Sequence, residues 1–80
     1  MDNSELLSQV NEIFIKTLNN ESIQLTTESQ ATDIEEWDSL NHIMLVVAIE
    51  KHFNIRFGSQ EIQSWNKVGD MLNSISEKIK

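Results

Sequence analysis

The sequence predicts an all-α fold: an antiparallel four-helix bundle with three long helices, a short third helix and a long loop between helices one and two. Three stretches carry apolar residues at helical spacing. The chain has no proline and only two glycines, so little in it would break a helix. Its 80 residues make one small domain over residues 1–80. A domain of this size buries about 60–65% of the surface of its unfolded chain.

The first helix is predicted over residues 3–18. Asn19 and Asn20 follow it, and asparagine tolerates the left-handed conformation in which helices commonly end. Polar residues occupy one face of this helix, so the apolar face is predicted to be core. That face consists of Leu6, Leu7, Val10, Ile13, Phe14 and Leu18.

Residues 20–37 are polar and show no sustained period, which predicts a long loop. Because ordered loops of this length are uncommon in a compact domain, we expect apolar residues within it to pin it to the bundle. A partly disordered loop is the alternative, and residues 28–31 could form a helical turn. The pinning residues would be Ile23, Leu25, Ile34 and Trp37.

The second helix is predicted over residues 39–53. Asp38 is a good N-cap, which places Ser39 at about the first helical position. The run from Ile43 to Ile49 is apolar without a break, so this helix would be apolar all round. A buried strand is disfavoured, because the pattern continues to Phe53 and is too long for a typical strand.

The second helix divides into two apolar stripes on a helical wheel. If one stripe is core, the other is at least partly exposed and leads away from Ser39. Burial of both stripes is the alternative. The core stripe would be Leu45, Val46, Ile49 and Phe53, and the exposed stripe Leu40, Ile43, Met44 and Val47.

The remainder of the chain predicts a short helix over residues 59–65 and a last helix over 67–79. Ser59 would cap the short helix and Asn66 the last one. Trp37 and Trp65 are interpreted as packing anchors at helix ends.

Ser39 is the candidate modification site. A serine at the first helical position is not needed as the cap, and its hydroxyl points outward beside unpaired backbone N–H groups. The positive end of the helix dipole makes this a favourable place for a phosphate ester.

Asp38-Ser39-Leu40, followed by an apolar helix, resembles the phosphopantetheine attachment site of acyl carrier proteins. Acyl carrier proteins are also acidic chains of about 80 residues with the serine near the middle, so the resemblance covers nearly the whole chain. The resemblance implies that Ser39, flanked by Asp38 and Leu40, receives 4′-phosphopantetheine from coenzyme A through a separate phosphopantetheinyl transferase. The arm would hold an acyl or polyketide-type intermediate as a thioester, and the chain itself would not be an enzyme.

The resemblance also implies a docking face for acyl-loading and acyl-processing enzymes, which would meet it with basic or apolar patches. A small apolar surface of this kind is typical of weak, transient protein–protein contacts. The docking residues would be Leu40, Ile43, Met44, Val47 and Glu50.

Several positions depart from the pattern of fatty-acid synthesis carriers, whose second helix is strongly acidic. Asn41 and Met44 stand where acidic residues are usual, and Lys51 adds a positive charge. Trp37 before the motif also looks more like specialised free-standing carriers. We therefore favour a specialised carrier over a fatty-acid carrier, with an aminoacyl or peptidyl carrier as a further variant. An unmodified helical protein-interaction module is the alternative from a different class.

The composition restricts the partners and the compartment. With 13 acidic and 6 basic residues and a net charge of −7, the chain is not expected to bind nucleic acid or an anionic membrane. It contains no cysteine, which excludes disulfides and thiolate sites. No basic signal-peptide start and no membrane-spanning run are evident. We expect a cytoplasmic monomer.

Other groupings of reactive residues are weaker. Ser39 and His42 are spaced to share a helix face, but a hydrolase would also need an orienting group, an oxyanion site and a pocket. His52 lacks the partners of a zinc site. A cluster of acidic residues does not match a calcium loop, and solvated charge is the better interpretation; it comprises Asp33, Glu35, Glu36 and Asp38.

Overall fold

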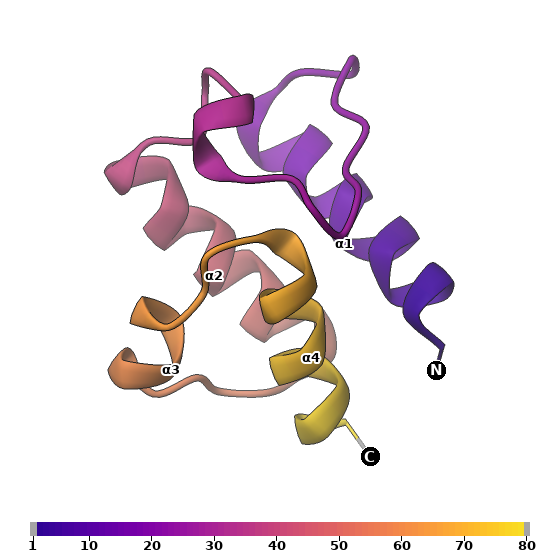
Figure 1. The fold of residues 1–80 in the computed structure, drawn as a ribbon, viewed down its shortest axis with the longest axis vertical. Helices are drawn as coiled ribbons and strands as arrows, with labels where there is room; N and C mark the ends of the chain where they lie inside the picture. The colour runs from indigo at the N-terminus through magenta and orange to yellow at the C-terminus, as the bar shows by residue number, and fades with distance from the viewer. Residues whose placement is uncertain (1, 80) are drawn as a thin grey trace.

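The computed structural model describes residues 2–79, which form an all-helical bundle (Figure 1). This confirms the predicted fold class, and no strand occurs in the described part of the chain. The elements in order are α1 (Asn3–Leu18), the short 3-10 helix η1 (Ala31–Asp33), α2 (Ser39–Phe53), α3 (Ser59–Gln63) and α4 (Val68–Lys78).

The core lies where α1 contacts α2 and α4. Leu6, Val10 and Phe14 on α1 are fully buried, as are Leu45 and Ile49 on α2. The α4 side of the core is made by Val68, Met71, Leu72 and Ile75, all at most 1% exposed.

Two asparagines end the two long helices. Asn19 follows α1 with φ 55°, and Asn54 follows α2 with φ 58°. Asparagine adopts this left-handed conformation more readily than most residues. In each case the backbone N–H bonds back into the last turn, to the carbonyls of Ile15 and Glu50.

The last two helices differ from the prediction at their ends. The short helix stops at Gln63, because the hydroxyl of Ser64 donates to the carbonyl of Glu61 over 2.7 Å and the chain turns there. Its N-cap is Gly58, and Ser59 is already helical. α4 begins one residue later than expected.

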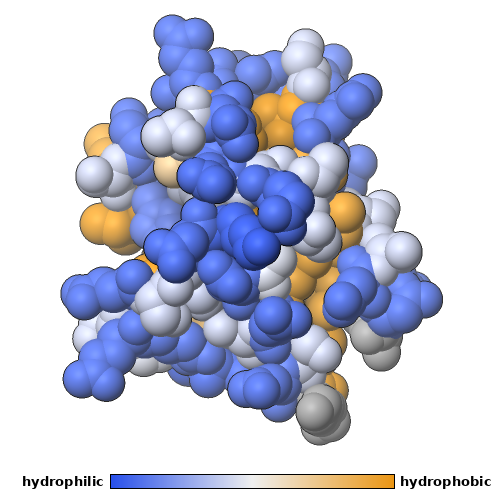
Figure 2. Space-filling view, viewed as in Figure 1, coloured by the Kyte–Doolittle hydropathy of each residue, from blue (hydrophilic) through white to orange (hydrophobic). Residues whose placement is uncertain are grey.

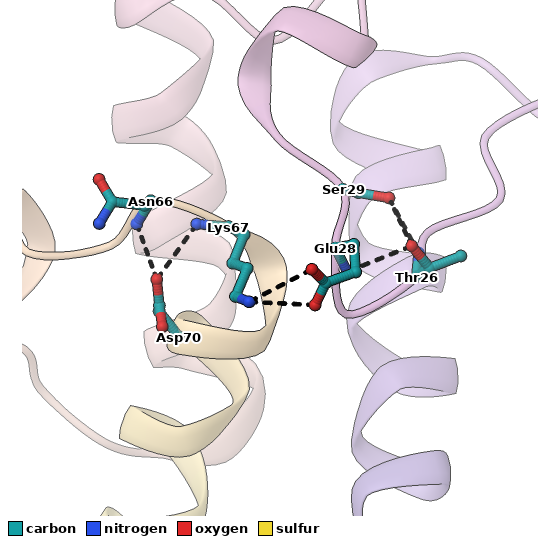
Figure 3. A network of polar contacts seen from close by, with 6 residues as sticks. All are labelled: Thr26, Glu28, Ser29, Asn66, Lys67 and Asp70. Carbon is teal, nitrogen blue, oxygen red and sulfur yellow. Dashed lines mark hydrogen bonds and ion pairs between the residues drawn. The ribbon is translucent and has the colours of Figure 1, made fainter.

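Asn66 does not cap α4. Asp70, in the first turn, reaches back instead, and its Oδ2 accepts the backbone N–H groups of Asn66 over 2.9 Å and Lys67 over 3.3 Å (Figure 3). The N-cap position belongs to Lys67.

The long loop is ordered by pinning, as predicted: Ile23, Leu25 and Trp37 are buried and Ile34 packs on the core. Asn11 on α1 adds polar ties, because its Nδ2 donates to the Ile23 carbonyl and its Oδ1 accepts the Leu25 N–H over 2.7 Å. The helical turn expected at 28–31 lies later, at η1.

The middle of the loop is bonded to the start of α4. Backbone N–H groups of Val68 and Gly69 donate to the carbonyls of Ser29 and Thr27 over 2.9 and 2.8 Å. A Cβ at Gly69 would lie 3.0 Å from the Thr27 carbonyl oxygen, so the close approach favours glycine. An ion pair of 3.0 Å between Lys67 and Glu28 lies outside these bonds (Figure 3). These contacts with α4 fix the path of the loop that leads to the start of α2.

Candidate functional site

Ser39 is the first residue of α2, as predicted, and Asp38 caps the helix. The backbone at Asp38 is extended, and its Oδ1 accepts the Asn41 N–H over 2.8 Å. The Asn41 side chain donates to the carbonyl of Glu36 over 2.7 Å, which fixes the approach of the loop. Ser39 itself is exposed, and within residues 2–79 no hydrogen bond engages its hydroxyl.

The start of α2 suits an anion on Ser39. The unpaired N–H groups of the first turn and the helix dipole place partial positive charge there. No acidic residue lies in the first turn of the helix itself. The hydroxyl is thus accessible and surrounded by backbone that would stabilise a phosphate ester.

An apolar strip runs down α2 from Ser39. We name its four residues the exposed strip: Leu40 is 70% exposed, Ile43 62%, Met44 53% and Val47 42%. They are the large hydrophobic residues exposed in the described part of the chain. Apolar surface is visible in Figure 2 at the left edge, on the side where α2 begins in Figure 1.

The opposite stripe of α2 is core, with one qualification. Leu45, Val46 and Ile49 are buried as predicted. Phe53 is only half-buried, because it lies in the last turn of α2 and contacts the edge of the core. The two-sided burial of α2 considered from the sequence does not occur.

Trp37 and His42 form a pair beside Ser39 that the sequence did not predict. The Trp37 Nε1–H donates to Nδ1 of His42 over 2.9 Å, and the two ring planes are within 21° of parallel with centroids 6.0 Å apart. Trp37 also meets Phe14 of α1 edge-on at 4.9 Å, and His42 meets Trp65 edge-on at 6.3 Å. Burial lowers the pKa of His42 below its ordinary value of 6.5.

A cavity of about 420 Å³ lies against Ser39. Its lining combines the attachment candidate with its cap, a residue of η1 and the indole–imidazole pair. These residues are Ala31, Trp37, Asp38, Ser39 and His42.

No protein-family model matches the chain, but individual relatives match nearly all of it. The acyl carrier protein of Petrotoga mobilis is 30% identical over 79 residues, which are 99% of this chain and 93% of the relative. That of Borreliella burgdorferi is 30% identical over 78 residues, 98% of each chain. The chain belongs to the acyl carrier protein family. A solution NMR structure of the holo acyl carrier protein from Geobacter metallireducens agrees, with a TM-score of 0.88, 38% identity and coverage of 92% of this chain and 85% of that one.

Family membership makes the chain a carrier and not an enzyme, with 4′-phosphopantetheine as its cofactor. The residues present fit that group. Ser39 offers an exposed hydroxyl at a helix N-terminus, and the cavity beside it leaves room for the first atoms of the arm.

Glu50 differs from the other predicted docking residues of this acyl carrier protein. Its side chain is only 13% exposed; Oε2 accepts the Phe57 N–H over 2.9 Å and Oε1 lies 3.8 Å from Arg56. The carboxylate holds the connector after α2 and is not available to a partner. We therefore leave it out of the docking face.

The alternative chemistries have no support in the geometry of this acyl carrier protein. His42 uses Nδ1 to accept from Trp37, and no hydrogen bond joins it to Ser39 within the described residues. No metal-binding group of three or more ligands occurs in residues 2–79. Over the same range, no helix has the length and apolar character needed to cross a bilayer.

Proposed function

We propose that Ser39 carries the 4′-phosphopantetheine arm and that this chain presents an acyl or polyketide-type intermediate to partner enzymes. The observation that carries the proposal is the position of Ser39. Its hydroxyl is exposed, is engaged by no other described residue and lies at the head of the exposed strip. When attached, the arm supplies a terminal thiol that holds the intermediate as a thioester.

The modification would need a separate phosphopantetheinyl transferase. The Ser39 Oγ attacks the phosphorus of coenzyme A that bears pantetheine. The Oγ–P bond forms as the P–O bond to adenosine 3′,5′-bisphosphate breaks, and the hydroxyl proton passes to a base of the transferase. This chain contributes the accessible hydroxyl and the positive helix end.

The exposed strip would serve as the docking face for the transferase and for acyl-processing enzymes. Leu40, Ile43, Met44 and Val47 supply a small apolar surface, which suits weak and exchangeable binding. The partners would therefore be recognised chiefly by apolar patches, with basic residues around them attracted by the net charge of −7.

A specialised role is favoured over fatty-acid synthesis. The first turn of α2 has no acidic residue, and Glu50, the remaining acidic candidate, is engaged by the connector. The exposed strip that leads down α2 from Ser39 is thus apolar and uncharged. An enzyme that recognises an acidic helix would gain little from it.

Intact mass after incubation with coenzyme A and a broad-specificity transferase tests the attachment site. We expect a gain of one phosphopantetheine unit, which Ser39→Ala abolishes without loss of helical circular dichroism. Ser59→Ala is the matched control, because Ser59 is also an exposed serine at the first position of a helix and should leave the gain intact.

A gain that persists in Ser39→Ala would move the attachment to another residue. No gain in the wild-type protein would favour the unmodified interaction module.

A further inference from the structure

We propose that the cavity beside Ser39 binds the pantoyl segment of the phosphopantetheine arm, with Trp37 and Ala31 against its two methyl groups and His42 Nε2–H as the hydrogen-bond donor. This inference rests on the proposed attachment at Ser39. It assigns a binding site to residues of η1, of the end of the loop and of the first turn of α2.

The cavity has the size and position for this segment. Its volume of about 420 Å³ falls within the range of about 300–1,000 Å³ that is usual for small-molecule sites. Ser39 is part of its lining, so the first atoms beyond the phosphate reach it without stretching the arm.

The cavity favours a neutral, branched and partly apolar ligand. Trp37 and Ala31 contribute apolar side chains to its lining. Asp38 lines the same cavity with a carboxylate that already accepts the Asn41 N–H, and it would repel a second anion placed inside. The phosphodiester therefore stays at the helix end, and the uncharged pantoyl unit, with two methyls, a hydroxyl and an amide, enters the cavity.

The hydrogen-bond donor follows from the tautomer of His42. Since Nδ1 accepts from Trp37, the neutral ring carries its proton on Nε2. Nε2 has no hydrogen-bond partner within residues 2–79. Every buried side-chain nitrogen or oxygen in that range has a partner, so the unpartnered Nε2 is accessible. Burial lowers the pKa of His42, which keeps this neutral form present. The hydroxyl or amide carbonyl of the pantoyl unit is the acceptor.

Two variants separate the binding role of His42 from its structural role. His42→Asn keeps an acceptor near the Nδ1 position for Trp37 but removes the Nε2 donor. Ala31→Leu fills the cavity from the exposed η1 and leaves the indole–imidazole bond untouched. Each is loaded with an isotope-labelled arm, and complete loading is checked by intact mass.

The measurement is the NMR order of the two arm amides in the holo protein. In the wild type we expect the inner, pantoyl-side amide to have an order parameter above about 0.6, and the outer amide near the thiol to be flexible and below it. The indole resonance of Trp37 should shift between apo and holo protein, and that of Trp65, bonded to Ser74, should shift less. Both variants should bring the inner amide to the value of the outer one.

Two failures have different meanings. A fully loaded wild-type protein with two equally flexible amides and an unmoved Trp37 resonance would overturn the cavity proposal and leave the carrier function standing. An absence of mass gain would overturn the attachment itself, and the cavity proposal with it.

Discussion

Asp38 and Ser39 are neighbours in sequence, yet the turn into α2 gives them different roles. Asp38 is outside the helix and accepts the Asn41 N–H, whereas Ser39 is inside and has its hydroxyl in solvent. These roles could be predicted, because capping depends on local sequence. The Trp37–His42 bond could not, because it joins residues five apart across the helix boundary, where no helical spacing applies.

The partly buried position of His42 predicts a pH dependence of stability. Burial lowers the pKa of His42 in the folded protein below 6.5. Between the folded pKa and 6.5, the unfolded chain therefore binds more protons than the folded one. The contribution of His42 is present above pH 6.5 and is lost as the pH falls from there through the folded pKa. Urea unfolding at several pH values should show the free energy of unfolding falling through this window.

Two substitutions isolate that effect. His42→Asn removes the titrating ring and keeps an acceptor for Trp37, so the stability of this variant should vary less below pH 6.5. His52→Asn is the control, because it removes an exposed histidine of α2 and leaves the His42 ring in place, so it should retain the wild-type slope. An unchanged slope in His42→Asn would show that other groups cause the dependence.

At the scale of elements, the ends of α1 and α2 follow local signals and the ends of α3 and α4 do not. The bounds of α1 and α2 coincide with the prediction, because apolar period, Asp38 and two left-handed asparagines agree. α3 ends earlier than predicted, where the Ser64 hydroxyl bonds to the Glu61 carbonyl, and α4 begins later, where Asp70 rather than Asn66 makes the side-chain bonds at the helix start. The Glu50 side chain turns inward because the segment after α2 folds back and brings the Phe57 N–H to it, and helical periodicity does not predict such a contact.

The two faces of α2 should differ in their contribution to stability. Leu45 is fully buried, and Leu45→Ala should lower the free energy of unfolding by about 2–5 kcal/mol through a cavity in the core. Val47→Ala, on the exposed strip, should cost about 0.5 kcal/mol, yet slow acyl transfer by partner enzymes. Urea denaturation measures the first effect and transfer kinetics the second.

Ile49→Ala provides a second core substitution, because Ile49 is also fully buried, whereas the half-buried Phe53 is a poorer choice. Equal stability losses at Val47 and Ile49 would contradict the assignment of the strip as a free surface.

Across the whole molecule, charge and apolar surface are separated. The chain carries a net charge of −7, but the exposed strip is uncharged and Glu50 is occupied. Among residues 2–79, three basic residues form ion pairs: Arg56 with Glu50, Lys67 with Glu28 and Lys78 with Glu61. The net charge can attract basic partners over about 8 Å at physiological salt, but it does not supply specific contacts beside Ser39.

Asn41→Asp would be a confounded way to restore an acidic helix. The Asn41 amide donates to the Glu36 carbonyl over 2.7 Å, and a carboxylate there would lose the bond and face a carbonyl oxygen. Met44→Glu is the cleaner substitution, because Met44 is 53% exposed on the strip.

The rate at which a fatty-acid ketosynthase turns over the loaded protein distinguishes a specialised carrier from a fatty-acid carrier. Met44→Glu should raise the turnover of the loaded protein at low salt, by up to about tenfold, because a charge beside the arm steers it toward a basic docking site. Met44→Gln is the matched control, with the same side-chain length and no charge, and it should not raise turnover. Added salt should remove the gain, since the pair would be screened. If the wild-type protein already turns over like a fatty-acid carrier, and Met44→Glu changes nothing at any salt concentration, the fatty-acid carrier replaces the specialised one.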